Sequence, residues 1–215
     1  MIINQYNICM RPLGMYVDQL CSKKPIPGGG SVAGLVAALG QGLVQMVSNF
    51  TKDNKKYKEV QQLVDEALKL GKNYLDTFKD LSMDDMFAYD QVSFAYVQAR
   101  PDFYDLSLKK KLDINETLHE AMLIPIAVID TCVKAMDLLE RIYDKFNKNL
   151  LTDFGVACKL FESAAYSSYL NVLVNEKTIT KGADLSNSKS CYEKCEKIKA
   201  QSDKIYNYVT ECLLK

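Results

Sequence analysis

The sequence predicts an all-α protein, with residues 1–215 forming one domain built as a bundle of about seven helices. Apolar residues recur at three- and four-residue spacing in several segments, as on one face of an α-helix. No segment alternates apolar and polar residues as a half-buried strand does. The breaks between the periodic segments are short clusters rich in Gly, Pro and Asn, none of them long enough to be a domain linker.

The predicted helices cover 10–21, 31–51, 55–80, 82–99, 115–145, 152–174 and 188–213. The segment 55–80 shows the clearest period, with apolar residues at Val60, Leu63, Val64, Ala67, Leu68, Tyr74, Leu75 and Phe78. The segment 31–51 is rich in Ala and Gly. Because Gly costs about 1 kcal/mol relative to Ala inside a helix, this segment is predicted to be a tightly packed central helix or a subunit contact. Its apolar run, 32–47, is shorter than a membrane span, so we predict a buried helix.

Composition and charge disfavour several other classes of protein. Lys plus Arg and Asp plus Glu both number 27, so no net charge attracts nucleic acid or an acidic membrane surface. The seven cysteines include no CxxC pair, which predicts reduced thiols and a cytoplasmic protein. Cys191 and Cys195 lie one helical turn apart, but His119 is the only histidine and is far away in the sequence, so we predict no bound metal.

A glycine-rich loop, Pro25-Ile26-Pro27-Gly28-Gly29-Gly30-Ser31, precedes the helix 31–51. Three glycines let a ligand approach the main chain, and Ser31 is predicted to cap the helix. Free amides at a helix start also attract anions. The segment fits the loose dinucleotide pattern GxGxxA, but no strand precedes it, so a nucleotide site is disfavoured. A flexible turn without a ligand remains an alternative.

An acidic pair, Asp84 and Asp85, precedes an apolar helical segment. Asp85, Tyr89 and Val92 follow i, i+4, i+7 spacing and therefore share one helical face. A carboxylate buried on that face would have a raised pKa and suit proton transfer. The alternative is that these acids only complement the helix dipole.

Two further polar features belong to the segment 152–174 and its continuation. Asp153 stands at the predicted start, where an acid favours the helix dipole. Asn171 and Asn175 lie one turn apart where Asn is a poor helix former. Either they cap the end of the helix, or a ligand requires them.

Several of these segments resemble the cyclodeaminase/cyclohydrolase family, formed by the cyclodeaminase domain of formimidoyltransferase-cyclodeaminase and by stand-alone methenyltetrahydrofolate cyclohydrolases. The loop and the residues after it resemble the family's PxPGGGSxAA, while Met46-Val47-Ser48-Asn49-Phe50-Thr51 and Lys55-Lys56-Tyr57 resemble MVxNLT and KKY. Four further segments resemble motifs of the family. Residues 85–92 resemble DxxA[FY]xxV and residues 120–125 resemble EAxxxP, while residues 152–157 resemble SDxGVA and residues 169–175 resemble ALxNVxxN. Thr152 replaces the usual Ser, and the last motif has one residue fewer before its first Asn.

The resemblance implies a helical homodimer that binds a tetrahydrofolate derivative without a metal or redox cofactor, with Asp85 as the catalytic residue. We expect the substrate-binding residues to be Pro27, Gly28, Gly29, Gly30, Ser31, Asn49, Lys55, Lys56, Tyr89, Asp153 and Asn171. The leading interpretation is a 5-formimidoyltetrahydrofolate cyclodeaminase. The alternatives are a 5,10-methenyltetrahydrofolate cyclohydrolase and a helical dimer that binds a folate or a partner protein without catalysis.

Overall fold

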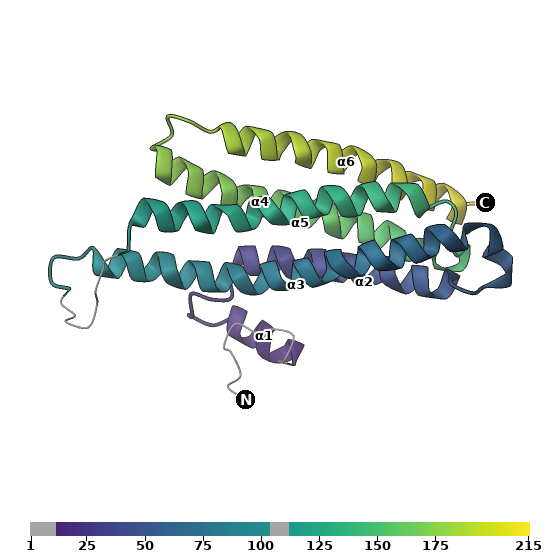
Figure 1. Cartoon of the computed structure of the whole chain (residues 1–215), viewed down its shortest axis with the longest axis horizontal. Helices are drawn as coiled ribbons and strands as arrows, with labels where there is room; N and C mark the ends of the chain where they lie inside the picture. Colours follow the sequence, from purple (N-terminus) through teal and green to yellow (C-terminus); the bar gives the residue numbers. More distant parts are fainter. Residues whose placement is uncertain (1–11, 104–111) are drawn as a thin grey trace.

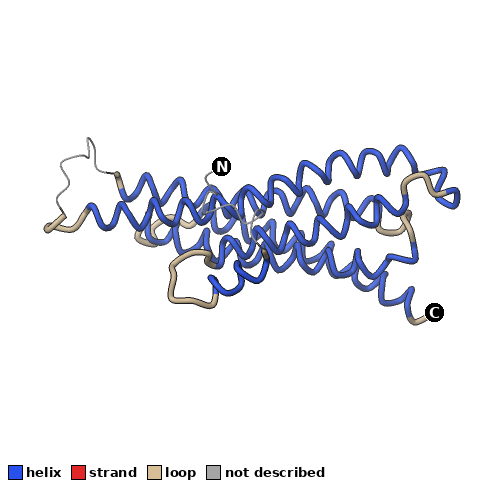
Figure 2. Tube along the Cα trace, turned by 90° about the horizontal axis from the view of Figure 1, so that it is seen from below, coloured by secondary structure: helices blue, strands red, loops and turns tan. Residues whose placement is uncertain are grey.

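The computed structural model describes residues 12–103 and 112–215, and within these ranges the chain forms helices and no strand. The α-helices are α1 (Leu13–Leu20), α2 (Gly29–Thr51), α3 (Gln61–Gln98), α4 (Ile114–Ile142), α5 (Leu151–Thr180) and α6 (Ser186–Leu213). Two short 3-10 helices, η2 (Lys55–Val60) and η3 (Lys148–Leu150), precede α3 and α5. Figures 1 and 2 show the elongated helical bundle, and the predicted all-α class is confirmed.

The described residues contain six α-helices where the sequence predicts about seven. The segments predicted as 55–80 and 82–99 are joined in α3, because no Gly or Pro interrupts the chain between Asp80 and Ser82. The acidic pair at 84–85 therefore lies inside a long helix, where the sequence suggests a helix start. Residues 55–60 form η2, and the first three residues of the predicted helix 10–21 fall outside α1, with 10 and 11 outside the described residues.

Five long helices, α2 to α6, form the bundle, and α1 lies outside it beside the start of α2 (Figure 1). α2 packs against α3 and α5, α4 packs against the same two helices, and α6 covers α4 and α5. The core between them is filled by large apolar side chains, among them Phe78, Ile129, Met136, Leu139, Phe154 and Phe161. This burial of apolar surface is the main force that holds the bundle together.

α2 comes unusually close to α3, and glycine makes the approach possible. A Cβ atom added to Gly34 would lie 2.9 Å from the backbone nitrogen and Cα of Ser82, and one added to Gly30 would lie 1.9 Å from Oδ1 of Asp85. The prediction of a tightly packed central helix is confirmed at these two contacts. α2 is 23 residues long, two residues longer at its start than the predicted helix 31–51, and it extends at both ends beyond the apolar run 32–47. Among the described helices only α2 is long and apolar enough to cross a membrane by length and composition, but more than half of its most apolar stretch is buried in the bundle.

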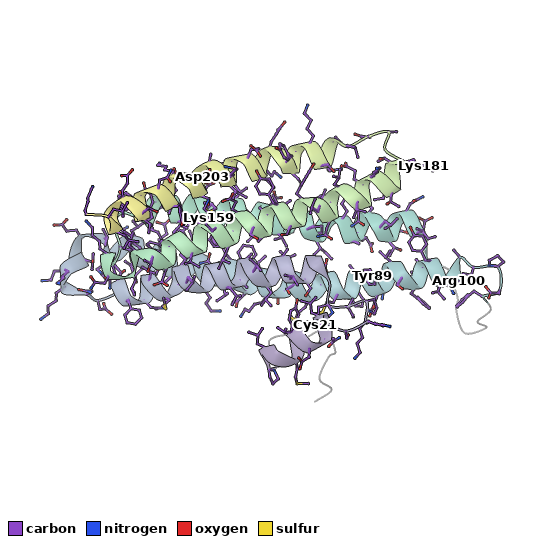
Figure 3. The ribbon with its side chains drawn as sticks, turned by 180° about the vertical axis from the view of Figure 1, so that it is seen from behind. Cys21, Tyr89, Arg100, Lys159, Lys181 and Asp203 are labelled. Atoms are coloured by element: carbon purple, nitrogen blue, oxygen red, sulfur yellow. The ribbon has the colours of Figure 1, made fainter. Side chains whose placement is uncertain are left out.

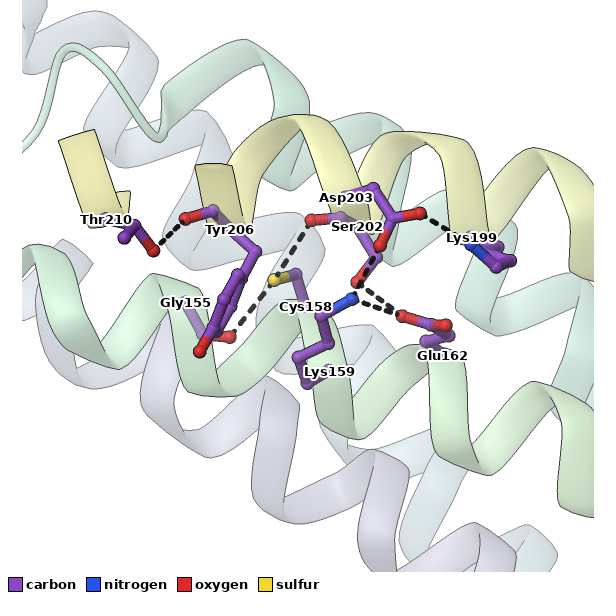
Figure 4. A network of polar contacts seen from close by, with 9 residues as sticks. All are labelled: Gly155, Cys158, Lys159, Glu162, Lys199, Ser202, Asp203, Tyr206 and Thr210. Carbon is purple, nitrogen blue, oxygen red and sulfur yellow. Dashed lines mark hydrogen bonds and ion pairs between the residues drawn. The ribbon is translucent and has the colours of Figure 1, made fainter. Parts of the chain in front are cut away.

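α6 is attached by an apolar face and by surface ion pairs. Lys159 of α5 contacts Glu162 and Asp203, and Lys199 also contacts Asp203 (Figure 4). Water and salt screen pairs near the surface, so these contacts contribute little to stability. At the other end of α6, the buried carboxylate of Glu176 accepts hydrogen bonds from the backbone N–H groups of residues 187 and 188. It thereby satisfies free amides at the start of α6.

Candidate active site

A pocket of about 270 Å³ lies where α2 begins. α3, α4 and α5 extend past the start of α2, so the N-terminus of α2 faces the space that they enclose (Figure 1). The lining residues come from the glycine loop and from these three helices: Pro25, Ile26, Gly28, Gly29, Gly30, Asp85, Ala88, Tyr89, Val92, Ala121, Pro125, Asn171, Val174 and Asn175. This volume is just below the usual range of about 300 to 1,000 Å³ for small-molecule sites.

Asp85 is the carboxylate of this pocket. Burial raises its pKa to about 6, and a hydrogen bond from the backbone N–H of Ser31 opposes that rise. A carboxyl group with a pKa near 6 exchanges its proton readily close to neutral pH, which suits a general acid and base. Asp85, Tyr89 and Val92 all line the pocket from α3, so the predicted common face of these three residues is confirmed. Figure 3 shows Tyr89 on α3, near the loop that follows Cys21.

Ser31 does not cap the helix as the sequence suggests. α2 begins at Gly29 with Gly28 as its N-cap, and no side chain caps it. The Ser31 side chain is instead fully buried and forms hydrogen bonds with Tyr16 and Ser82. Ser31 contributes its backbone N–H to the pocket. This N–H can reach Asp85 because the glycines before Ser31 allow α3 to approach α2 closely.

Asn171 and Asn175 enter the pocket from α5, which continues to Thr180 and is therefore not capped by either residue. The side-chain amide of Asn171 donates a hydrogen bond to the carbonyl of Ser167, which fixes its orientation. Asn amides both donate and accept hydrogen bonds, so this wall can bind the polar edge of a heterocycle.

The structure brings together six of the predicted site residues: Gly28, Gly29, Gly30, Asp85, Tyr89 and Asn171. Ser31 is adjacent through its backbone, and Pro27 is buried in the same loop without lining the cavity.

The other predicted residues, Asn49, Lys55, Lys56 and Asp153, lie at the opposite end of α2, about 30 Å away along the helix axis. A hydrogen bond from the Asn147 backbone to Thr51 shows that the start of α5 also lies at that end. Within one chain these four residues do not contact the pocket.

The predicted site omits the contribution of α4 and the end of the α5 wall. Ala121 and Pro125 line the pocket from α4, and Val174 and Asn175 do so from α5. One signal in the sequence was Pro125 inside a helical segment, since Pro in a helix interior is costly and needs a local reason. Another was the one-turn spacing of Asn171 and Asn175.

A second cavity of about 220 Å³ lies on the other side of Ala88 and Ala121, which line both cavities. It contains two acidic side chains, Asp84 and Glu120. Burial and the neighbouring Asp80 raise the pKa of Asp84. This side of the site is therefore unfavourable for an anionic group. Across residues 12–103 and 112–215, no three His, Cys, Asp or Glu side chains are grouped to hold a metal ion.

The fold and the pocket define a helical-bundle protein whose candidate site combines a glycine loop with one buried carboxylate. Residues 12–197 match the formiminotransferase-cyclodeaminase family, and the chain belongs to this family. The resemblance inferred from the sequence motifs is thereby confirmed.

Individual relatives carry two different activities in their names. The chain is 34% identical to a methenyltetrahydrofolate cyclohydrolase from Methylorubrum extorquens over 75% of this chain and 77% of that protein. It is 25% identical to the formimidoyltransferase-cyclodeaminase of Sus scrofa over 83% of this chain, and spans only 33% of that longer protein. The structure of a formiminotetrahydrofolate cyclodeaminase from Thermotoga maritima matches with a TM-score of 0.76 and 28% identity, covering 95% of this chain and 96% of that one.

Proposed function

We propose that this protein is a folate enzyme that acts on the one-carbon bridge between N5 and N10, as a 5-formimidoyltetrahydrofolate cyclodeaminase. The observation that carries the proposal is Asp85, a carboxyl group with a pKa of about 6 between the glycine loop and the polar wall of α5. The names of the family and of its relatives support a folate as the substrate.

The chemistry needs one group that takes up and releases a proton. N10 attacks the carbon of the protonated amidine carried by N5, whose imine nitrogen thereby becomes an NH2 group, and the proton on N10 must leave as the new C–N10 bond forms. Asp85 accepts that proton as a carboxylate and delivers it to the amine nitrogen of the intermediate. The C–N bond to this nitrogen then breaks, which releases ammonia and leaves 5,10-methenyltetrahydrofolate. The steps are pure acid–base chemistry, so we propose that no metal or redox cofactor takes part.

A second candidate is a 5,10-methenyltetrahydrofolate cyclohydrolase, favoured by the 34% identical relative of that name, which matches over most of both chains. Water would attack the methenyl carbon, and Asp85 would accept the proton that this water loses and return it to N5 as the C–N5 bond breaks, while the remaining hydroxyl proton is released to solvent. The same carboxylate would also stabilise the positive charge of the bridge.

The test supplies the purified protein separately with 5-formimidoyl- and 5,10-methenyltetrahydrofolate and follows methenyl absorbance. Appearance of absorbance from the first compound supports the cyclodeaminase. Faster loss from the second than in buffer supports the cyclohydrolase. No change with either compound, together with measurable folate binding, would contradict both and favour a non-catalytic folate-binding protein.

The negatively charged glutamate tail of the folate is expected to leave the pocket past Lys23 and Lys24. Both lysines are exposed and directly precede Pro25 and Ile26 in the pocket wall, whereas the neighbouring cavity contains Asp84 and Glu120. Replacing both lysines by Ala should weaken binding of a polyglutamylated folate several-fold, and binding of the monoglutamate less. Isothermal titration at two salt concentrations checks this, because attraction between exposed charges weakens with salt.

The matched control replaces Lys55 and Lys56 by Ala, which removes the same charge at the far end of α2. This variant should bind like the wild type if the tail stays within one chain. A larger loss with Lys55 and Lys56 than with Lys23 and Lys24 would contradict the proposed path. It would instead favour a tail that reaches the far end of a second copy.

We also propose that the protein is a cytoplasmic homodimer. Exposed apolar side chains cover α1 and the outer faces of α2 and α5: Leu13, Met15, Val17, Leu39, Phe50, Val156 and Leu170. Such a surface is typical of an interface with another chain. Light scattering at micromolar concentration should give twice the 24.3 kDa chain mass. Leu39→Asp should lower this mass, while Leu214→Asp at the exposed C-terminus should not; a wild-type mass of one chain would contradict the dimer.

A further inference from the structure

Three buried hydroxyl groups connect α1 to the start of α2 and to α3. The phenol of Tyr16 lies 3.1 Å from Oγ of Ser31, which lies 3.1 Å from Oγ of Ser82. Oγ of Ser82 also donates a hydrogen bond of 2.7 Å to the carbonyl of Ser31. Tyr16 is the one buried residue of α1, and both serines are inaccessible to solvent.

The number of protons fixes the direction of these hydrogen bonds. Each hydroxyl has a single proton to donate. Ser82 uses its proton on the Ser31 carbonyl, so Ser31 must be the donor in the bond between the two serine hydroxyls. The Ser31 proton is then also used, so the Tyr16 phenol must donate to Ser31. Burial raises the pKa of Tyr16, which agrees with a phenol that stays protonated.

This chain of donors ends at the residue whose backbone N–H contacts the pocket carboxylate. Ser31 donates that N–H to Asp85, and Gly34 brings the same part of α2 against the backbone of Ser82. We propose that Tyr16 is a positioning residue of the active site: through Ser31 it holds the start of α2 against α3 and so keeps the Ser31 N–H directed at Asp85. The effect of Tyr16 on the reaction rate rests on the proposed function, whereas the hydrogen bonds that link Tyr16 to Ser31 do not depend on it.

The other elements around Asp85 carry few charged or titratable side chains that could change its pKa. α2 carries no titratable side chain from Gly29 to Thr51. The pocket-lining residues of α4 are Ala121 and Pro125, and those of α5 are Asn171, Val174 and Asn175, none of them charged. The pocket-lining residues of α3 add the Tyr89 phenol, and the acidic Asp84 faces the neighbouring cavity. The charged Lys23 and Lys24 precede the loop and are exposed.

The direct test measures the pKa of Asp85 by carbon-13 NMR of the carboxyl group, in the full-length protein labelled at aspartate. The hydrogen bond from the Ser31 N–H favours the carboxylate form of Asp85 and lowers its pKa, whereas burial raises that pKa. Weakening the hydrogen bond therefore raises the pKa. Tyr16→Phe should therefore raise the pKa of Asp85 by roughly 0.3 to 1 unit, a part of the larger shift that complete loss of a hydrogen bond to a charged group would cause. The acid limb of kcat/KM should move to higher pH by the same amount. Tyr143→Phe, a half-buried tyrosine on the far side of the bundle, should move neither.

Ser31→Ala provides a second variant, since it keeps the backbone N–H and removes the hydroxyl that links Tyr16 to Ser82. It should raise the pKa of Asp85 by a similar amount, and adding Tyr16→Phe should then cause no further shift. An unchanged Asp85 pKa in folded Tyr16→Phe, or additive shifts in the double variant, would overturn the proposal. The NMR titration needs no substrate. A protein inactive on both folates would therefore refute the proposed function while leaving the positioning role to be decided by the pKa alone.

Discussion

Replacing Asp85 by Asn is expected to lower the turnover rate by about 10²- to 10⁴-fold, the usual contribution of general acid–base catalysis. Asn keeps the size of the side chain but can neither accept nor return the proton. The fold and the affinity for folate should change little, so the loss should appear in kcat rather than in KM. Steady-state kinetics with the substrate that proves active measure kcat and KM, and circular dichroism checks the fold.

Two other aspartates provide matched controls. Asp84→Asn changes a carboxyl group in the neighbouring cavity, and Asp153→Asn changes one at the far end of the bundle. Each should retain most of the activity. If Asp85→Asn turned over normally while either control lost activity, the assignment of the proton transfer to Asp85 would be wrong.

The pH dependence follows from the same carboxyl group. Its pKa is raised to about 6, so it is mainly ionised above that pH and mainly protonated below it. A base must be ionised in the free enzyme, so kcat/KM should fall as the pH is lowered through about 6. Asp85→Asn should remove this limb from the residual activity.

Replacing Gly30 by Ala is expected to abolish most of the activity while the protein still folds. The added methyl group would lie 1.9 Å from Oδ1 of Asp85, so the carboxyl group must rotate away. It would then lose the N–H of Ser31 and its place in the pocket. We expect a loss of about 10²-fold or more in kcat, because catalytic groups must be held to within about an ångström. The folded fraction should be kept, since the clash is with the end of a side chain and Ala favours a helix more than Gly does.

Gly34→Ala is the informative comparison, because the same methyl group would there meet the backbone of Ser82 at 2.9 Å. A backbone cannot rotate away, so α2 and α3 must separate and the melting temperature should fall. The two variants therefore separate an effect on the site from an effect on packing. Wild-type kcat in Gly30→Ala would contradict the arrangement of Asp85 against α2.

The sequence contained enough to predict the helical class, the glycine loop and the face that Asp85 shares with Tyr89. These depend on local spacing, which the helix geometry converts directly into position. The length of α3 was mispredicted: the sequence was divided into helices 55–80 and 82–99, although no Gly or Pro between Asp80 and Ser82 disrupts a helix.

The remaining parts of the site depend on tertiary packing, which periodicity does not encode. Nothing local shows that Ser31 turns its side chain toward Tyr16, or that α4 supplies Ala121 and Pro125. The motif residues Asn49, Lys55 and Lys56 belong to the resemblance but lie at the far end of α2 in one chain. Whether they serve a second copy is a question of assembly that the titration of the lysine variants addresses.

The composition of α2 also affects the order in which the molecule forms. Five of its 23 residues are glycine, and an isolated helix of this kind is unstable in water. We therefore expect α2 to gain its structure by docking onto partners that are already helical, with backbone amides that exchange with solvent sooner than those of α4. Because the start of α2 supplies both the loop and the N–H donor to Asp85, the site would form only once α2 has docked. Partly folded chains, even those rich in helix, would then be inactive.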